Sequence, residues 1–474
     1  MLDEQKVKQI WETKIKETFE EYIRTPNVSP AFNHNWKRDG HMQKVVELYE
    51  TWAKKNTPEN ATVFIQNIEE KTPLLVINIP AREVNNSDTI LLYGHLDKQP
   101  EMVGWNDGID PWSPTYQGDR LYGRGSADDG YAMFSAVLAI NDIEEQKLAH
   151  PRYLIIIEAS EESGSPDLPF HLEQLSSNLL SHSCKELEEV SMVICLDSGA
   201  LTYEHLWITN SLRGLIEIHL TIRILKQGTH SGGAGGIVPS TTHVLRALLD
   251  RIAKSPSGEI LLEELNVEIP KNIIEAAENV ALILGENNPH GLPFAENVEP
   301  LDKKVSDQLI ANTYKPALEI IAIEGIPKIE NAGNVLLPEV KVGLSFRLPP
   351  GVKPEIAIAA IAEELNRDTP YNAQISLKIE SLASGWAAPI QKEWLTKALN
   401  ETSMKHFGKP AQYMGEGGTI PFMFMLGEKY RDAQFMVTGL LGPESNAHGP
   451  NEFLHLPTFF KLTACVADVL SSYQ

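Results

Sequence analysis

Thr89-Ile90-Leu91-Leu92-Tyr93-Gly94-His95-Leu96-Asp97 joins a continuous apolar run to a histidine and an aspartate. Three other runs are apolar in the same continuous way, and they span residues 153–157, 192–196 and 435–438. Strands that are apolar on both faces are typical of the centre of a parallel sheet. A helical stretch at residues 131–146 suits a crossover between two such strands. The sequence therefore predicts a layered α/β domain with a mainly parallel central sheet.

Residues 209–384 follow a different pattern. Apolar and polar residues alternate from Ile216 to Ile224, and again from Val340 to Phe346. Strict alternation indicates strands with one wet face, paired in an antiparallel sheet. A continuous apolar run appears again only after this segment, at residues 435–438. We therefore predict an α/β domain made of residues 1–208 and 385–474, with an inserted α+β domain between them.

The composition excludes several classes of partner. Lys and Arg number 41 against 64 for Asp and Glu, and a net charge of −23 disfavours binding to nucleic acid or to an anionic membrane. No apolar stretch approaches the roughly 18 residues of a membrane span. The three cysteines, Cys184, Cys195 and Cys465, are too few for a disulfide framework. These features favour the cytoplasm.

Five segments carry residue types that bind metal ions, at or after the ends of predicted strands. They contain His95, Asp128, Glu161-Glu162, Asp197 and His448. Each alone has an ordinary explanation, such as an interior histidine or a solvated acidic doublet. Together they lie where open α/β sheets place their sites, and they suit two divalent cations about 3.5–4 Å apart that activate a water. The set predicts a hydrolase.

Two local patterns suggest roles beyond metal binding. Asp97 stands two residues after His95, so both side chains share one face of the strand and the carboxylate can orient the imidazole. Glu161 and Glu162 are adjacent carboxylates, and such neighbours often take different roles in a site. One would bind metal, while the other would take a proton from the attacking water as general base.

Two longer motifs carry a family resemblance. They are Leu121-Tyr122-Gly123-Arg124-Gly125-Ser126-Ala127-Asp128-Asp129 and Gly415-Glu416-Gly417-Gly418-Thr419-Ile420-Pro421. The chain resembles, over nearly its whole length, the co-catalytic zinc peptidases that include carnosinase, succinyl-diaminopimelate desuccinylase, aminoacylase and bacterial glutamate carboxypeptidase. The likeness is greatest to the dipeptidase branch. It implies two divalent metal ions per subunit, with zinc favoured over manganese or cobalt, and a homodimer.

The resemblance also implies a role for each ligand. One metal would be held by His95, Asp128 and Asp197, and the other by Asp128, Glu162 and His448. Asp128 would bridge the two, and the peptide bond after it would be cis. Glu161 matches the general base.

Residues outside the metal site are implied by the same likeness. The inserted segment resembles a lid and dimerisation domain, in which His230 would reach the active site of the partner subunit and steady the developing oxyanion. Arg347 matches an arginine that grips a substrate carboxylate, for which the guanidinium fork is suited. Asn334, Thr419 and Gly418 match further substrate-contacting positions.

We therefore expect hydrolysis of an amide bond in a small substrate with a free carboxylate, either a dipeptide or the C-terminal residue of a short peptide. An N-acyl amino acid deacylase would use the same metals and is the first alternative. A non-catalytic binding protein on the same fold is the second, disfavoured because every ligand is present. A single-domain aminopeptidase is disfavoured by the domain-sized insertion. Glu380–Trp386 and Ser198–Ala200 depart from the carnosinase pattern, so the substrate pocket differs.

Overall fold

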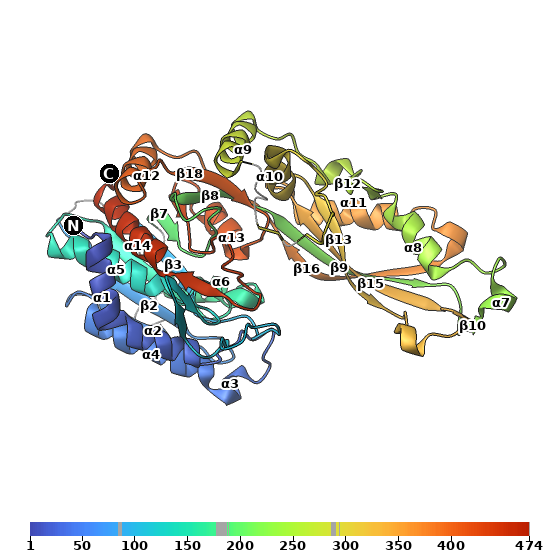
Figure 1. Cartoon of the computed structure of the whole chain (residues 1–474), viewed down its shortest axis with the longest axis horizontal. Helices are drawn as coiled ribbons and strands as arrows, with labels where there is room; N and C mark the ends of the chain where they lie inside the picture. Colours follow the sequence, from blue (N-terminus) through green and yellow to red (C-terminus); the bar gives the residue numbers. More distant parts are fainter. Residues whose placement is uncertain (84–87, 177–186, 188, 286–290, 293, 474) are drawn as a thin grey trace.

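The computed structural model describes residues 1–83, 88–176, 187, 189–285, 291–292 and 294–473. Two bodies follow one another along the long axis of the molecule (Figure 1). One holds both chain ends and a central sheet between helices, and we call it the α/β domain. The other is a long sheet with helices on one side, and we call it the inserted domain.

The central sheet of the α/β domain confirms the predicted strands. It has six strands, in the order β1 (Thr62–Gln66), β2 (Leu74–Ile79), β6 (Arg152–Glu158), β3 (Thr89–His95), β7 (Val190–Cys195) and β19 (Gln434–Val437). The four strands from β6 to β19 run parallel, while β1 and β2 pair antiparallel. Parallel strands share one carboxyl edge, so the segments that follow β3, β6, β7 and β19 meet there.

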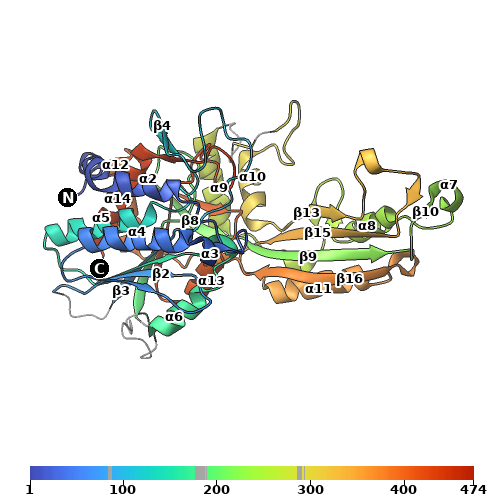
Figure 2. The same cartoon turned by 90° about the horizontal axis from the view of Figure 1, so that it is seen from below.

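Helices cover both faces of this sheet, which explains the continuous apolar runs. Along β3, Ile90 and Leu92 belong to one core cluster while Leu91 and Tyr93 belong to the other. The first cluster is closed by α1 (Glu4–Ile10), η1 (Trp11–Ile15), α2 (Lys16–Arg24), α4 (His41–Asn56), α5 (Ala132–Glu145), α12 (Glu393–His406) and α14 (Leu456–Ser471). The second is closed by α6 (Leu168–Ser176) and α13 (Pro421–Lys429), and Figure 2 shows the two layers.

Two small sheets support the loops beside the carboxyl edge. One orders β17 (Trp386–Ala387), β8 (Trp207–Leu212) and β18 (Gln412–Glu416), and the other orders β20 (Phe453–His455), β5 (Arg120–Tyr122) and β4 (Thr115–Gln117). The loop after β5 carries Asp128, and the segment before β20 carries His448. Pairing of β20 with β5 brings these two segments together although they are far apart in the sequence.

The inserted domain is built on an antiparallel sheet, as the alternation predicted. Its four strands are ordered β13 (Ala317–Glu324), β15 (Glu339–Leu348), β9 (Gly214–Arg223) and β16 (Gln374–Ala383). The two alternating runs pair directly, with Leu220 opposite Val342. Their apolar side chains form a core with α8 (Thr241–Leu249) and α11 (Pro354–Asn366), which lie on one face of the sheet.

Two helices from the inserted stretch pack on the α/β domain. These are α9 (Lys271–Leu284) and α10 (Val305–Tyr314), and their apolar side chains contact Trp207 of β8 and Met414 of β18. The sequence analysis placed both helices in the inserted domain, because they lie between residues 209 and 384. The division of the chain at 208/209 and 384/385 stays a prediction.

In the described part of the chain, no helix combines the length and the apolar character needed to cross a membrane. Cys195 and Cys465 are buried free thiols, and Cys184 lies outside the described residues.

The core of the inserted domain gives a direct stability test. Ile218 of β9 is wholly buried, whereas its neighbour across the sheet, Ile379 of β16, is half exposed. Replacing Ile218 by Ala removes buried methyl groups and leaves a cavity, which should cost about 2–5 kcal/mol. The matched Ile379→Ala change should cost about 1 kcal/mol or less. Thermal unfolding followed by circular dichroism measures both, and equal losses would contradict the assignment of this core.

Candidate metal centre

The carboxyl edge of the central sheet gathers the predicted ligands. His95 is the last residue of β3, and Glu161 and Glu162 begin the short 3-10 turn η2 (Glu161–Ser163) after β6. Asp197 follows β7 by two residues, and it is largely buried. Asp128 and His448 come from the two loops that β5 and β20 bring together. All the predicted metal-binding side chains therefore arrive at one place.

Asp128 lies between the two histidines. Its Oδ1 is 3.2 Å from Nε2 of His95, and its Oδ2 is 3.1 Å from Nε2 of His448. One carboxylate thus offers a different oxygen to each imidazole, which is the geometry of a bridging ligand. The peptide bond from Asp128 to Asp129 is cis, as the resemblance implied.

Two groups of side chains can each hold a cation. His95, Glu161 and Asp197 form one, and Asp128, Glu162 and His448 form the other, with the ligand atoms of each group within 4.8 Å of one another. Asp128 also contacts the first group through His95. Unlike the predicted ligand set, the first group includes Glu161, which the sequence analysis treated as the general base.

The electrostatics of the site favour cations. Burial raises the pKa of Glu161 and of Glu162, and neighbouring carboxylates raise both further. Burial likewise raises the pKa of Asp197 to about 7. Burial also opposes ionisation of Asp128, but hydrogen bonds from His448 and His95 keep the pKa of its carboxyl well below the usual value.

The charge and the donor atoms of the site show whether divalent ions fit there. Several buried carboxylates share the site with only two imidazoles, so the negative charge is poorly compensated by protein groups. Imidazole nitrogen and carboxylate oxygen are the donors that zinc, manganese and cobalt accept. The donor set therefore fits a pair of divalent metal ions.

Asp97 contacts both sides of the site. The Nδ1 atom of His95 is 3.1 Å from the backbone carbonyl oxygen of Asp97 and 3.5 Å from its Oδ1. The carboxylate accepts the backbone N–H groups of Glu161 and Glu162, both at 3.1 Å. Asp97 thus orients the imidazole mainly through its carbonyl, because its carboxylate is engaged in holding the two glutamates.

Sequence reasoning missed a buried ion pair beneath the site. Glu452 accepts the backbone N–H of Ala127 at 3.0 Å and of Asp128 at 3.2 Å on Oε1, while Oε2 receives Nη1 of Arg124 at 2.8 Å. Arg124 also donates to the carbonyl oxygen of Gly449, next to His448, at 2.6 Å. The amides before the α5 helix therefore bind Glu452. No local signal predicts such a pair, although Arg124 stands in the Leu121–Asp129 motif.

The predicted substrate-binding residues fall into two separate groups. Arg347 on β15 donates from Nη1 to Oγ1 of Thr419 at 3.1 Å, with Gly418 adjacent in the chain. His230 ends β10 (Thr229–His230), which pairs with β14 (Val335–Leu336), and the carbonyl of Asn334 accepts the N–H of Ser231 at 2.8 Å. In Figures 1 and 2, β10 lies at the end of the inserted domain farthest from the central sheet.

Comparison with known proteins identifies the family. The model of the peptidase family M20/M25/M40 matches residues 91–472. The chain belongs to this family. Membership confirms the prediction of an enzyme of the metallopeptidase class and agrees with the two ligand groups described above.

Individual members of the M20 family resemble the chain over most of its length. A cysteinylglycine-S-conjugate dipeptidase from Corynebacterium striatum is 24% identical, over 94% of this chain and 98% of that protein. A β-Ala-His dipeptidase from Mus musculus is 25% identical, over 77% of this chain and 73% of that protein. The crystal structure of human carnosine dipeptidase 1 superposes with a TM-score of 0.74 at 19% identity, covering 99% of this chain and 97% of that one, and so shares its fold.

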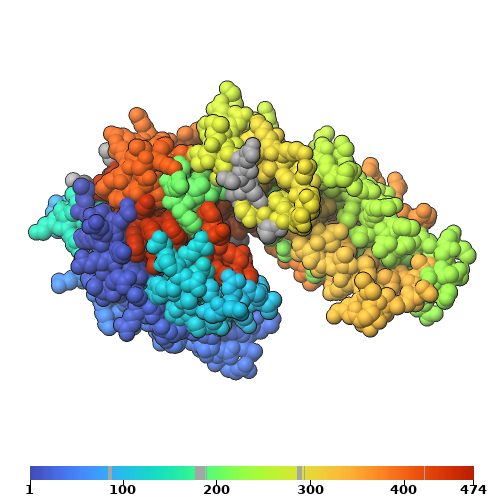
Figure 3. All heavy atoms as spheres, in the orientation of Figure 1, coloured from blue at the N-terminus to red at the C-terminus, as the bar shows by residue number. Residues whose placement is uncertain are grey.

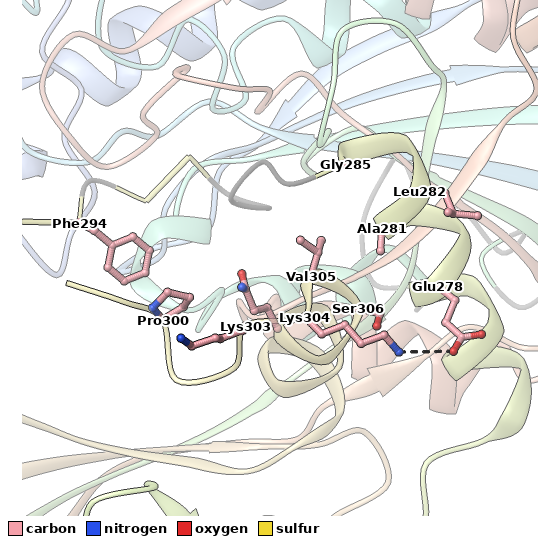
Figure 4. A pocket seen from close by; sticks show the side chains of 11 residues that line it. Glu278, Ala281, Leu282, Gly285, Phe294, Pro300, Lys303, Lys304, Val305 and Ser306 are labelled. Atoms are coloured by element: carbon pink, nitrogen blue, oxygen red, sulfur yellow. Dashed lines mark ion pairs between the residues drawn. The ribbon is translucent and has the colours of Figure 1, made fainter. Parts of the chain in front are cut away.

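Two of the hollows in the surface of this M20 peptidase lie near the junction of its domains or beside α9 and α10. A broad notch separates the α/β domain from the inserted domain (Figure 3). A second hollow of ≈ 720 Å³ lies beside α9 and α10, where Lys304 and Glu278 form an ion pair at 3.7 Å (Figure 4). None of the residues that line the second hollow belongs to the metal groups, so we assign no part of the chemistry to it.

The Arg124–Glu452 pair generates a prediction about metal binding. Glu452→Gln should weaken metal binding by about 10–100-fold, the usual effect of losing a group that orients ligands. The reason is that Gln offers one acceptor oxygen where the carboxylate serves three amides and a guanidinium. Titration of metal-free protein with zinc measures the affinity. The control Glu444→Gln breaks an exposed ion pair with Arg120 and should leave the affinity unchanged.

Proposed function

We propose that this protein is a metal-dependent dipeptidase or carboxypeptidase that cleaves an amide bond in small peptides with a free carboxylate. The observation that carries the proposal is the position of Asp128, whose two oxygens lie 3.2 and 3.1 Å from His95 and His448. The dipeptidase names of the two relatives described above support the same reaction.

His95, Asp128 and Asp197 would hold one divalent ion, and Asp128, Glu162 and His448 the other. Zinc suits this mixed set of imidazole and carboxylate, and manganese and cobalt are the alternatives. When bound, such ions polarise the scissile carbonyl and lower the pKa of water. Asp97 keeps the His95 ring and the Glu161–Glu162 turn in place for this purpose.

Glu161 moves the proton. Its buried carboxylate has a raised pKa, which suits a group that accepts a proton from the attacking water and then gives it to the leaving amine. The substrate carboxylate binds Arg347, whose orientation is supported by Thr419. Gly418 borders open space, since a side chain there would meet no atom within 4 Å, and the substrate occupies that space.

The active form is a homodimer in the cytoplasm. His230 and Asn334 lie on the far end of the inserted domain, so they contact a substrate only in the notch of a second copy. Strand β13 supports dimerisation, because it is an edge strand whose Ile320, Ile321 and Ile323 are 43%, 59% and 51% exposed. Exposed apolar edges of this kind pair with another chain.

The deacylase alternative uses the same ligands, but the relatives that match most of the chain carry dipeptidase names. The non-catalytic alternative is disfavoured by the complete ligand set. Activity against a panel of dipeptides and N-acetyl or N-succinyl amino acids separates these functions.

Glu161→Gln should lower kcat by about 10²–10⁴-fold, because an amide cannot accept the proton. Both metal ions should remain bound, whereas Glu162→Gln should lose one. Steady-state kinetics and metal analysis of the same preparations measure the two effects, with Glu173→Gln on the exposed face of α6 as the inert control. Full activity of Glu161→Gln would refute its role as base, and loss of an ion would make it a ligand.

Mixed dimers test the role of His230. Glu161→Gln and His230→Ala proteins should each be nearly inactive alone. After subunit exchange, random mixing should restore about a quarter of wild-type activity, since half of the dimers would hold one complete site. Recovery requires that His230 of the Glu161→Gln chain serves the site of its partner. Absence of recovery after exchange, verified with two affinity tags, would place His230 outside the reaction across the dimer.

A further inference from the structure

Arg213 lies where the chain passes from the α/β domain into the inserted domain. Strand β8 ends at Leu212, and β9 begins at Gly214. The chain returns beside it, and the backbones touch: a Cβ on Gly214 would lie 2.7 Å from the carbonyl oxygen of Ala383, and one on Gly385 would lie 2.8 Å from that of Leu212. Arg213 is therefore the side chain at a close-packed crossing between the two domains.

The contacts of Arg213 converge on the Glu416–Thr419 segment and on α10. Its Nε donates to the carbonyl oxygen of Gly417 at 3.1 Å, and its Nη2 donates to Oδ1 of Asn312 at 3.1 Å. Its backbone N–H donates to the carbonyl oxygen of Glu416 at 3.3 Å. The side chain is only 8% exposed, so its donors are committed to the protein.

Thr419 connects Arg213 to Arg347. The Thr419 hydroxyl donates to the carbonyl oxygen of Arg213 at 2.6 Å. A hydroxyl has a single proton, so it must face Nη1 of Arg347, 3.1 Å away, with a lone pair. The backbone of Arg213 thus sets the direction of the hydroxyl, and the hydroxyl sets the position of the guanidinium.

The two arginines also form a positive pair. Burial and, to a smaller extent, the charge of Arg347 together lower the pKa of Arg213 to about 10. Burial lowers the pKa of Arg347 as well, while the charge of Glu217 on the neighbouring strand opposes that shift. Ion pairs have a nitrogen–oxygen distance of at most 4.0 Å. Among the residues that the structure describes, no carboxylate lies that close to the guanidinium of Arg213 or of Arg347. The arrangement is therefore ready for an anion from outside the chain.

We propose that Arg213 is a positioning residue for the substrate carboxylate: it holds the Gly417–Thr419 loop against the domain crossing, and through Thr419 it orients Arg347. Arg213 does not grip the substrate itself, because each nitrogen of its buried guanidinium already faces a protein acceptor, on Gly417, Lys315 or Asn312. Arg213 sets the affinity for the substrate carboxylate and has no part in metal binding. This inference rests on the proposed peptidase function.

Arg213→Lys tests the proposal in the metal-loaded enzyme. Lysine keeps the charge but lacks the planar fork that reaches two acceptors, so KM for a dipeptide should rise about tenfold while kcat stays within about twofold. The control is Arg223→Gln at the other end of β9, which breaks an exposed ion pair with Glu339 and should change neither constant. An unchanged KM, or a loss confined to kcat, would overturn the proposal.

A double-mutant cycle separates positioning from a general structural effect. If Arg213 acts through Arg347, Arg213→Lys should raise KM by less than about twofold in an Arg347→Lys background, because groups that share one network are not additive. Additive effects would overturn the proposal. Asn312→Ala, on α10, removes one acceptor of Arg213 and should also raise KM. This variant serves as the test if Arg213→Lys folds poorly.

Binding without turnover distinguishes this inference from the function on which it rests. Calorimetric titration of Glu161→Gln protein with the same dipeptide reads affinity directly, and adding Arg213→Lys should weaken it about tenfold. A wild-type enzyme that cleaves neither a dipeptide nor the C-terminal residue of a short peptide would refute the proposed function. Dipeptide affinity that is unchanged by Arg213→Lys would refute the inference alone.

Discussion

The structure depends on one carboxylate that faces two imidazoles. Asp128 offers a separate oxygen to His95 and to His448, and these three residues come from the end of β3 and from two loops. A buried carboxylate in that position is costly unless hydrogen bonds and cations compensate its charge. The two histidines supply part of that compensation, and the donor set suits divalent metal ions that would supply the rest. The end of β3 and the two loops are thereby held together.

The residues proposed to bind metal and those proposed to bind substrate lie in different parts of the molecule. The central sheet positions the metal ligands, the Gly417–Thr419 loop and Arg347 meet at the domain crossing, and His230 lies at the far end of the inserted domain. Under the proposed function, a site divided in this way would be complete only when two bodies, or two chains, come together. Such closure would exclude water and restrict the substrate to small molecules.

Much of the fold follows from hydrophobic patterning. The runs at β3, β6 and β7 are apolar on both faces because helices cover both sides, and β9 and β15 alternate because one face is wet. The packing of α9 and α10 on β8 and β18 was not predictable. Both helices are amphipathic, and their apolar stripe does not say which of two neighbouring bodies it will cover.

The sequence by itself determined which residues could bind metal, since His, Asp and Glu recur together after buried strands, where open α/β sheets place their sites. Only the tertiary structure decided how they meet: that Asp97 orients His95 mainly through its carbonyl, that Glu161 groups with Asp197, and that Glu452 pairs with Arg124. Those contacts join residues up to 328 positions apart. Periodicity reports which face of an element is buried, and it carries no information about which distant side chain arrives there.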